Sequence, residues 1–252
     1  MSGHSKWSTI KRKKGANDAK RGKLFTRLGR EITIAARHGG DPDANFALRL
    51  AVDRARASNM PKENIDRAIK RGTGDDKEGV VFEEILYEAY APHGAALLIE
   101  VATDNRNRTL AEIKHALNRH GGNMAEPGSV SWQFAQKGYI AAQAGAMSYD
   151  DLFLVAAEAG ADDVIDDPET IEIYTPRDSL QKVEEALQQA GIKIEEVRLD
   201  WVAKTPIDLD AAEAQKVLSM VETLEELDDT QSVFSNLNMT DALVSSLEAE
   251  AG

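Results

Sequence analysis

The sequence predicts an α+β protein: an N-terminal helical bundle plus two ferredoxin-like α+β domains, one inserted into the other. Up to Gly72, apolar residues recur at three- and four-residue spacing, which indicates amphipathic helices. After Gly72 the pattern changes to strands that alternate with helices. The later part of this stretch has the βαββαβ order of a ferredoxin-like sandwich. The earlier part lacks a closing helix and strand, which segments near the C-terminus supply.

The helical domain is predicted at residues 23–75. Its first helix starts at Lys23 and ends at Gly39-Gly40, and it has an apolar face made of Leu24, Leu28, Ile32 and Ala35. A second helix is expected over 44–58. The third begins at Pro61, because proline is well tolerated at the first helical position, and ends at Gly72.

The first α+β domain is predicted to be discontinuous, at residues 76–135 plus 203–237. Its strands are expected over 81–90, 95–102 and near 130–134. A helix over about 109–120 follows the second strand, and Thr109 and Glu112 have the capping-box spacing that marks a helix start. The closing helix and strand are expected at 210–227 and 232–235.

The inserted α+β domain is predicted at residues 136–202. Strands are expected there over 138–142, 162–166, 169–175 and 192–202, and helices over 148–159 and 178–190. Residues 238–252 are expected to form a short, weakly held tail.

Charge is divided sharply along the chain. The formal net charge is -13, yet residues 1–72 carry 18 Lys and Arg against 7 Asp and Glu. The remainder carries 12 basic against 36 acidic residues. Such an asymmetry is typical of a basic segment that binds polyanions, although a solubilising terminus is the simpler alternative.

Residues 1–22, here called the basic arm, contain few groups that can be buried. Trp7 and Ile10 are the large apolar residues among glycines and lysines, so we expect the arm to be mobile when unbound. Trp7 suits stacking on a base beside phosphate contacts; the alternative is that it folds back on the domain. The nucleic-acid contacts predicted in the arm are His4, Lys6, Trp7, Lys11, Arg12, Lys13, Lys14, Lys20 and Arg21.

A basic stripe continues along the first predicted helix, opposite its apolar face. The stripe consists of residues at helical spacing: Lys20, Lys23, Arg27, Arg30 and Arg37. The last four complete the predicted nucleic-acid-binding set. We expect this stripe to face phosphates.

A candidate anion site is predicted at Asn105, Arg106 and Arg108. Arginines at a helix N-terminus lie on the unfavourable side of the helix dipole, but beside free backbone donors they can bind a phosphate or carboxylate. The alternative is that each arginine pairs with an acid such as Asp104 or Glu126.

No strong catalytic constellation is present. The histidines have no zinc spacing, and there is no GxSxG or HExxH motif. An aspartate-rich magnesium site at 162–167 is the enzymatic alternative, and the expectation is a protein with no catalytic residues, metal or cofactor. The absence of cysteine and of a long apolar run favours a cytoplasmic protein without a membrane partner.

Several motifs together resemble the YebC family. They include Gly3-His4-Ser5-Lys6-Trp7, Tyr87-Glu88-Ala89-Tyr90-Ala91-Pro92-His93-Gly94, Thr103-Asp104-Asn105-Arg106-Asn107-Arg108-Thr109 and Gly128-Ser129-Val130. The resemblance covers nearly the whole chain except about the last fifteen residues. It implies a helical domain, two α+β domains with one inserted in the other, and a non-enzymatic regulator of gene expression.

The resemblance leaves the type of nucleic acid open. Bacterial members are described as DNA-binding transcriptional regulators, a mitochondrial relative is a translational activator, and some members are ribosome-associated. The partner is therefore expected to be DNA, or ribosomal or messenger RNA together with the ribosome. The middle helix offers only Asn45 for reading bases, and the arm suits irregular RNA. A protein-interaction scaffold is a third hypothesis.

Overall fold

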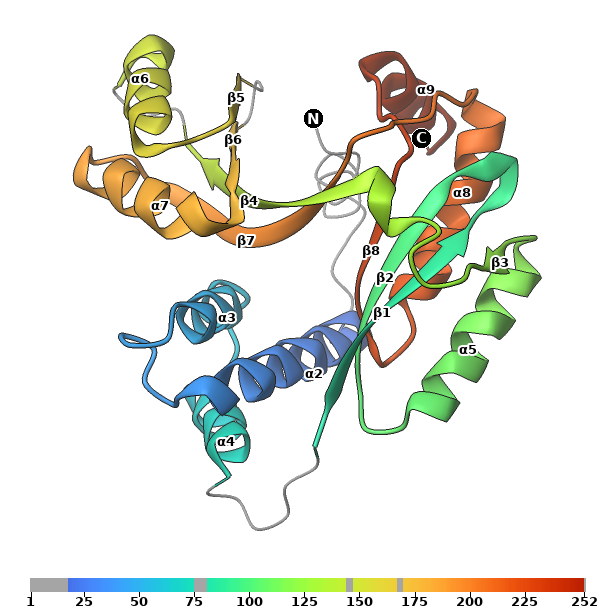
Figure 1. The fold of residues 1–252 in the computed structure, drawn as a ribbon, viewed down its shortest axis with the longest axis horizontal. Helices are drawn as coiled ribbons and strands as arrows, with labels where there is room; N and C mark the ends of the chain where they lie inside the picture. The colour runs from blue at the N-terminus through green and yellow to red at the C-terminus, as the bar shows by residue number, and fades with distance from the viewer. Residues whose placement is uncertain (1–17, 75–80, 144–146, 167–169, 252) are drawn as a thin grey trace. The chain divides into compact units, whose positions relative to one another are not determined.

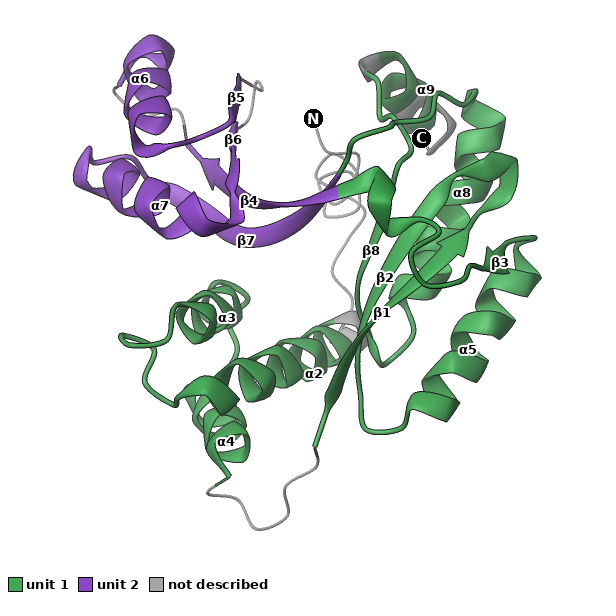
Figure 2. Ribbon diagram, viewed as in Figure 1, with its two compact units in different colours: residues 1–134, 203–252 green, residues 135–202 purple. Residues whose placement is uncertain are grey.

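The chain forms two compact units (Figures 1 and 2). The computed structural model describes residues 18–74, 81–143, 147–166 and 170–251. The first unit comprises the residues up to 134 together with 203–252, and the second comprises 135–202. The sequence-based limits of the inserted domain are 136 and 202. Within the described ranges, no helix has the length and apolar character needed to cross a membrane.

The N-terminal helices form a small bundle. They are α2 (Asp18–Ala35), α3 (Phe46–Ala57) and α4 (Lys62–Thr73), with a short 3₁₀ turn, η1 (Ala36–His38), after α2. The buried core combines one face of each helix and includes Leu28, Ile32, Leu48, Val52, Ile65 and Ala68. The predicted helical bundle is therefore confirmed, although α2 begins before the predicted start at Lys23.

Close packing of α4 on α2 requires a glycine. A Cβ atom at Gly72 would lie 2.3 Å from the carbonyl oxygen of Thr33 and 2.6 Å from the Cβ of Ala36. Both distances are shorter than van der Waals contact allows, so Gly72 permits an approach that any side chain would prevent.

The first antiparallel sheet has the strand order β3-β1-β2-β8. Its strands are β1 (Glu83–Tyr90), β2 (Ala96–Thr103), β3 (Asn123–Met124) and β8 (Thr230–Ser235), and a short turn, η2 (Pro92–Gly94), joins the first two. Helices α5 (Arg106–Arg119) and α8 (Ala211–Glu225) share its main core, where Leu97, Ile99, Ile113, Leu117, Val217 and Val221 are buried. Because β8 pairs with β2, the chain returns after the insertion to complete this sheet, as predicted.

The strand predicted near 130–134 is wrong. Residues Ser131–Gln133 form a 3₁₀ turn, η3, and the strand that pairs with β1 is β3. The physical reason is Glu88, whose buried carboxylate accepts hydrogen bonds from the backbone N–H groups of Gly128 (2.6 Å), Val130 (2.5 Å) and Ser131 (2.9 Å). Donors bound to a carboxylate are not available to a strand ladder.

The second sheet has the strand order β5-β6-β4-β7. The elements follow as β4 (Phe134–Ala142), α6 (Tyr149–Ala159), β5 (Asp163–Asp166), β6 (Ile171–Pro176), η4 (Arg177–Ser179), α7 (Leu180–Gln189) and β7 (Ile194–Ala203). This βαββαβ order with β4 and β6 in the middle is the ferredoxin-like arrangement that the sequence predicts. The predicted fold class is confirmed.

The C-terminal segment is not the weakly held tail that the sequence predicts. Residues Asp241–Ala251 form helix α9, and Met239, Leu243 and Leu247 are buried in the core that α8 shares. Leu243 and Leu247 are four residues apart and therefore lie on one helical face. Burial of this face holds the helix to the first unit.

Candidate nucleic-acid interface

Much of the predicted interface lies outside the described residues. This applies to His4, Lys6, Trp7, Lys11, Arg12, Lys13 and Lys14. Lys20 belongs to α2 by its backbone, and its side chain is outside the described part. The structure therefore bears directly on the members of the set from Arg21 onward.

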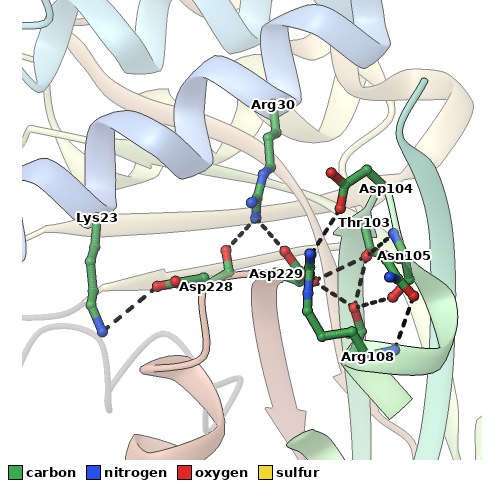
Figure 3. Close-up of polar contacts among 9 residues, drawn as sticks. Lys23, Arg30, Thr103, Asp104, Asn105, Arg108, Asp228 and Asp229 are labelled. Carbon is green, nitrogen blue, oxygen red and sulfur yellow. Dashed lines mark hydrogen bonds and ion pairs between the residues drawn. The ribbon is translucent and has the colours of Figure 1, made fainter. Parts of the chain in front are cut away.

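The basic stripe on α2 contacts the turn between α8 and β8 (Figure 3). This turn, residues 226–229, is here called the acidic turn. The Lys23 Nζ atom donates to the carbonyl oxygen of Glu226 at 3.0 Å and lies 3.8 Å from Asp228 Oδ1. Arg30 donates to the carbonyl oxygen of Asp228 and forms an ion pair of 3.0 Å with Asp229.

Arg27 completes this contact at the end of α8. Its guanidinium donates to the carbonyl oxygens of Glu225 (2.9 Å) and Gln231 (3.3 Å). The last carbonyls of a helix have no partner within the helix and carry its negative dipole end. Helix α8 has no basic residue in its last turn, so cations from α2 satisfy these groups instead.

These contacts divide the stripe into two groups. Arg27 and Arg30 bind acceptors of the chain itself, whereas the sequence predicts that they face phosphates; the side chain of Arg30 is only 14% exposed. Lys23 keeps 54% of its side chain exposed, and Arg21 is exposed and lies over the Phe25 ring. Arg37 is exposed but donates to the carbonyl oxygen of Phe82 at 2.6 Å. Arg21 of the arm and Lys23 of the stripe are thus the described cations of the predicted set best placed for a phosphate.

The predicted anion site already contains an anion of the chain. Arg108 donates to Asp229 at 2.7 Å and to Asp104 at 2.8 Å, which agrees with the pairing alternative for this residue. Arg106 is exposed. Asn105 caps α5, because its side chain accepts a hydrogen bond from the backbone N–H of Arg108 at 3.1 Å. The Arg108 guanidinium is therefore already paired with two carboxylates of the chain.

Asp229 is the centre of this polar cluster. Its side chain is 1% exposed and accepts hydrogen bonds from the hydroxyl groups of Thr109 (2.5 Å) and Thr103 (3.0 Å) in addition to Arg108. Burial raises the pKa of this carboxyl, but the bonds from Arg108 and the two threonines outweigh burial and hold the pKa below its usual value. The same pairing raises the pKa of Arg108. The cluster is therefore fully charged at neutral pH.

The capping box predicted at Thr109 and Glu112 is wrong. Helix α5 begins at Arg106, with Asn105 as its N-cap residue. Asparagine is among the best N-cap residues, and Thr109 instead directs its hydroxyl group to Asp229.

Sequence reasoning did not single out Glu88 or Asp229. An aspartate pair between a helix and a strand is usually a solvated turn, and a glutamate in a strand is usually exposed. Alternation along β1 gives no signal for Glu88, because Tyr87 and Ala89 face the main core and Glu88 therefore lies on the opposite face of the strand. Its one signal is that it belongs to a family motif, as do its partners Gly128 and Val130. For Asp229, no local pattern distinguishes it from its exposed neighbour Asp228.

Among the residues that the structure describes, no group of three or more His, Asp or Glu side chains is placed to hold a metal ion. The arrangement is that of a multidomain α+β protein. Its helical bundle is attached through cations to the end of α8, and its chain is basic at the N-terminus and acidic beyond it.

Comparison with known proteins identifies the family. Residues 5–75 match the TACO1/YebC N-terminal domain, and residues 82–237 match the TACO1/YebC second and third domain. The chain therefore belongs to the TACO1/YebC family. It is 53% identical over 253 residues to a protein of Chloroflexus aurantiacus, covering 99% of this chain and 100% of that one. It is 50% identical over 252 residues to CT1665 of Chlorobaculum tepidum, covering 99% of this chain and 100% of that one.

Both relatives are named probable transcriptional regulatory proteins. The fold is similar to the crystal structure of the conserved hypothetical protein Aq1575 from Aquifex aeolicus. The two share 44% sequence identity with a TM-score of 0.80, over 89% of this chain and 93% of that chain. The family and the names of its members point to a regulatory protein.

Proposed function

We propose that this protein is a non-enzymatic, nucleic-acid-binding regulator of gene expression, and that the basic arm supplies most of its phosphate contacts. The observation that carries this proposal is the division of charge, with 18 basic against 7 acidic residues up to residue 72 and 12 against 36 beyond it. A polyanion is attracted to the first segment and repelled by the rest. The arm, which includes Arg21, and the exposed Lys23 that follows it in α2 form one continuous basic stretch.

Contacts within the first unit hold α2, the helix that the arm leads into, in a defined position. Arg27 and Arg30 hold α2 against the end of α8 and the acidic turn. A basic segment that continues directly from a positioned helix can make its phosphate contacts from a defined point on the molecule. Arg27 and Arg30 are thus assigned a positioning role, and the arm is assigned the binding role.

The family name favours DNA as the target, but one observation favours RNA. Asn45, the candidate base-reading residue of the middle helix, caps α3 through Oδ1, and its Nδ2 donates to the carbonyl oxygens of Ala35 and Gly39, both at 2.8 Å. A side chain engaged in this way is not available to read base edges in a major groove. Ribosomal or messenger RNA, bound largely through phosphates and stacking, is therefore the second candidate.

The first test is nucleic-acid binding by a variant of the arm. Replacing Lys11, Arg12, Lys13 and Lys14 by Ala should weaken binding and flatten its salt dependence, because each lost phosphate contact removes about 0.9 from the log–log slope for duplex DNA and about 0.7 for a single strand. Fluorescence anisotropy with duplex DNA and single-stranded RNA of equal length measures both quantities.

The matched control removes the same charge elsewhere. The chain offers four exposed cations outside the N-terminal helical bundle, Lys114, Arg119, Lys182 and Lys216. Their replacement by Ala should leave the slope unchanged. Equal effects of the two quadruple variants would mean that net charge, and not the arm, governs binding.

Sedimentation of a cell lysate through a sucrose gradient separates the two targets. Co-migration with ribosomes that is lost in the arm variant supports translation. A protein that stays at the top of the gradient and crosslinks to promoter DNA supports transcription. A protein that does neither, and shows no salt-sensitive binding, is a protein-interaction scaffold.

A further inference from the structure

Helix α6 of the second unit exposes two large apolar side chains, Phe153 and Leu154. The helix packs on its own unit through other residues, since Leu152, Ala156 and Ala159 are the buried ones. Phe153 and Leu154 are 43% and 56% exposed. Ala157 is also exposed and lies one helical turn after both, so the three side chains share one outward face. We call Phe153, Leu154 and Ala157 the apolar patch.

The patch sits on a firmly held helix. The Ser148 side chain caps α6 by accepting a hydrogen bond from the backbone N–H of Asp151 at 3.2 Å, and Gly160 ends the helix in a left-handed conformation. The Tyr149 hydroxyl group donates to the carbonyl oxygen of Val164 at 2.9 Å, and its ring lies 6.3 Å from that of Phe153. The exposed side chains are therefore presented by a backbone that is already ordered.

Carboxylates flank the patch along the helix, in a segment of acidic composition. Asp150, Leu154 and Glu158 are spaced by four residues, so two exposed carboxylates flank the leucine along one row of the helix. Residues 138–176, which include α6, contain nine Asp and Glu and no Lys or Arg. Across residues 135–202 there are 15 acidic and 5 basic residues.

This combination specifies the chemistry of a partner. We infer that the apolar patch is a docking surface for an amphipathic, Lys/Arg-rich segment of a partner protein. Apolar side chains of such a segment cover Phe153 and Leu154, and its cations face Asp150 and Glu158. A nucleic acid or an anionic membrane carries the same sign of charge as this unit and is repelled. The inference goes beyond the proposed function, since it involves no residue of the arm.

Binding of a defined peptide tests the docking surface. The probe is a labelled 18-residue amphipathic Leu/Lys helix, titrated with the full chain and followed by anisotropy. Replacing Phe153 and Leu154 by Ser should raise the Kd by about tenfold or more, because few apolar anchors dominate such interfaces. The matched control, Val81→Ser with Leu86→Ser, changes exposed apolar residues of the other unit and should leave the Kd unchanged.

Charge is tested separately. Asp150→Asn with Glu158→Gln should weaken binding severalfold and reduce its salt dependence, whereas the matching Leu/Glu peptide should not bind. Binding of an unstructured Lys/Gln peptide as tight as that of the Leu/Lys helix would overturn the inference, since only charge would then be recognised. So would an unchanged Kd in the Phe153 and Leu154 variant.

A second copy of the chain is the competing occupant. Sedimentation velocity tests this. Self-association that is abolished by the Phe153 and Leu154 substitutions would assign the patch to a homo-oligomer and overturn the inference of a different partner protein. The arm variant described above should bind the peptide normally, so a failure of nucleic-acid binding and a failure of docking are distinguishable.

Discussion

Asp228 and Asp229 are adjacent in sequence but have opposite environments. The side chain of Asp228 is 75% exposed and that of Asp229 is 1% exposed. The first can keep its hydration, whereas the second depends on Thr103, Thr109 and two arginines for its stability. Asp228 lies within the acidic turn, whereas Asp229 directly precedes β8 and its carbonyl oxygen accepts a hydrogen bond from the backbone N–H of Ala102 in β2.

This contrast predicts unequal effects of one substitution. Asp229→Asn should lower the free energy of unfolding by roughly 3–5 kcal/mol, because it removes a buried charge and leaves Arg30 and Arg108 without their shared partner. Asp228→Asn should change it by no more than about 1 kcal/mol, as expected for an exposed ion pair. Urea unfolding measures both, and equal losses would contradict the central role of Asp229.

The buried carboxylate of Glu88 should make the stability of the fold depend on pH. Burial raises the pKa of this carboxyl, but the backbone N–H groups of Gly128, Val130 and Ser131 outweigh burial and lower the pKa. A carboxyl with a lowered folded-state pKa stabilises the fold above its unfolded pKa of about 4.3, and this contribution is lost as the pH falls through the folded value.

Glu88→Gln should therefore lower the Tm at pH 7, and the difference from the native chain should shrink as the pH falls below about 4. Thermal unfolding of both proteins between pH 3 and 7 measures this difference in Tm. Glu83→Gln, an exposed change in the same strand, is the control and should have little effect at any pH. A difference that stays constant down to pH 3 would mean that the carboxylate charge does not hold the 128–131 loop.

Between elements, the main finding is how α2 attaches to α8. Lys23, Arg27 and Arg30 are spaced by about one helical turn each, and all contact the end of α8, the acidic turn or the start of β8. Periodicity predicts that these cations share a face. It does not predict what that face contacts, because a phosphate backbone and the carbonyl end of a helix attract the same side chains.

Arg27→Ala should reduce stability more than nucleic-acid affinity. It removes hydrogen bonds to two carbonyl oxygens and the packing of a half-buried side chain, and we expect a loss of about 1–3 kcal/mol in the free energy of unfolding. Arg21→Ala, on the same helix but exposed, should change stability by less than about 0.5 kcal/mol. Denaturant unfolding and oligonucleotide binding on both variants separate the two roles. A larger loss of affinity with Arg27→Ala than with Arg21→Ala would assign Arg27 to the interface.

Across the whole molecule, the division of charge predicts a short binding site. If the basic arm carries the phosphate contacts and the remaining chain repels polyanions, lengthening the nucleic acid adds no contacts. The salt dependence of binding should then be the same for oligonucleotides of about 15 and 45 nucleotides, measured by anisotropy between 50 and 200 mM salt. A steeper slope for the longer one would show that other surfaces of the chain also contact phosphates.

Much of the fold follows from local patterns. The periodicity of Leu28 and Ile32 identifies α2, and the alternation of strands and helices identifies both α+β parts, including the return of the chain to complete the first sheet. Local patterns do not predict helix α9. Leu243 and Leu247 form a short apolar face, and such a helix is stable only when this face packs against a core formed by other elements. Local patterns do not predict the turn at Ser131–Gln133 either, because the carboxylate that binds its backbone belongs to Glu88, which lies far away in sequence.

The sequence by itself determined the class of fold, the family motifs and the separation of basic from acidic segments, because periodicity, spacing and charge are properties of the chain in order. Only the tertiary structure decided which charges are used internally. Arg27, Arg30 and Arg108 find acceptors contributed by residues 225–231 and by Asp104. Whether a cation is free for a phosphate depends on which carboxylates and carbonyls folding brings within hydrogen-bond distance, and long-range contacts of this kind leave no local pattern.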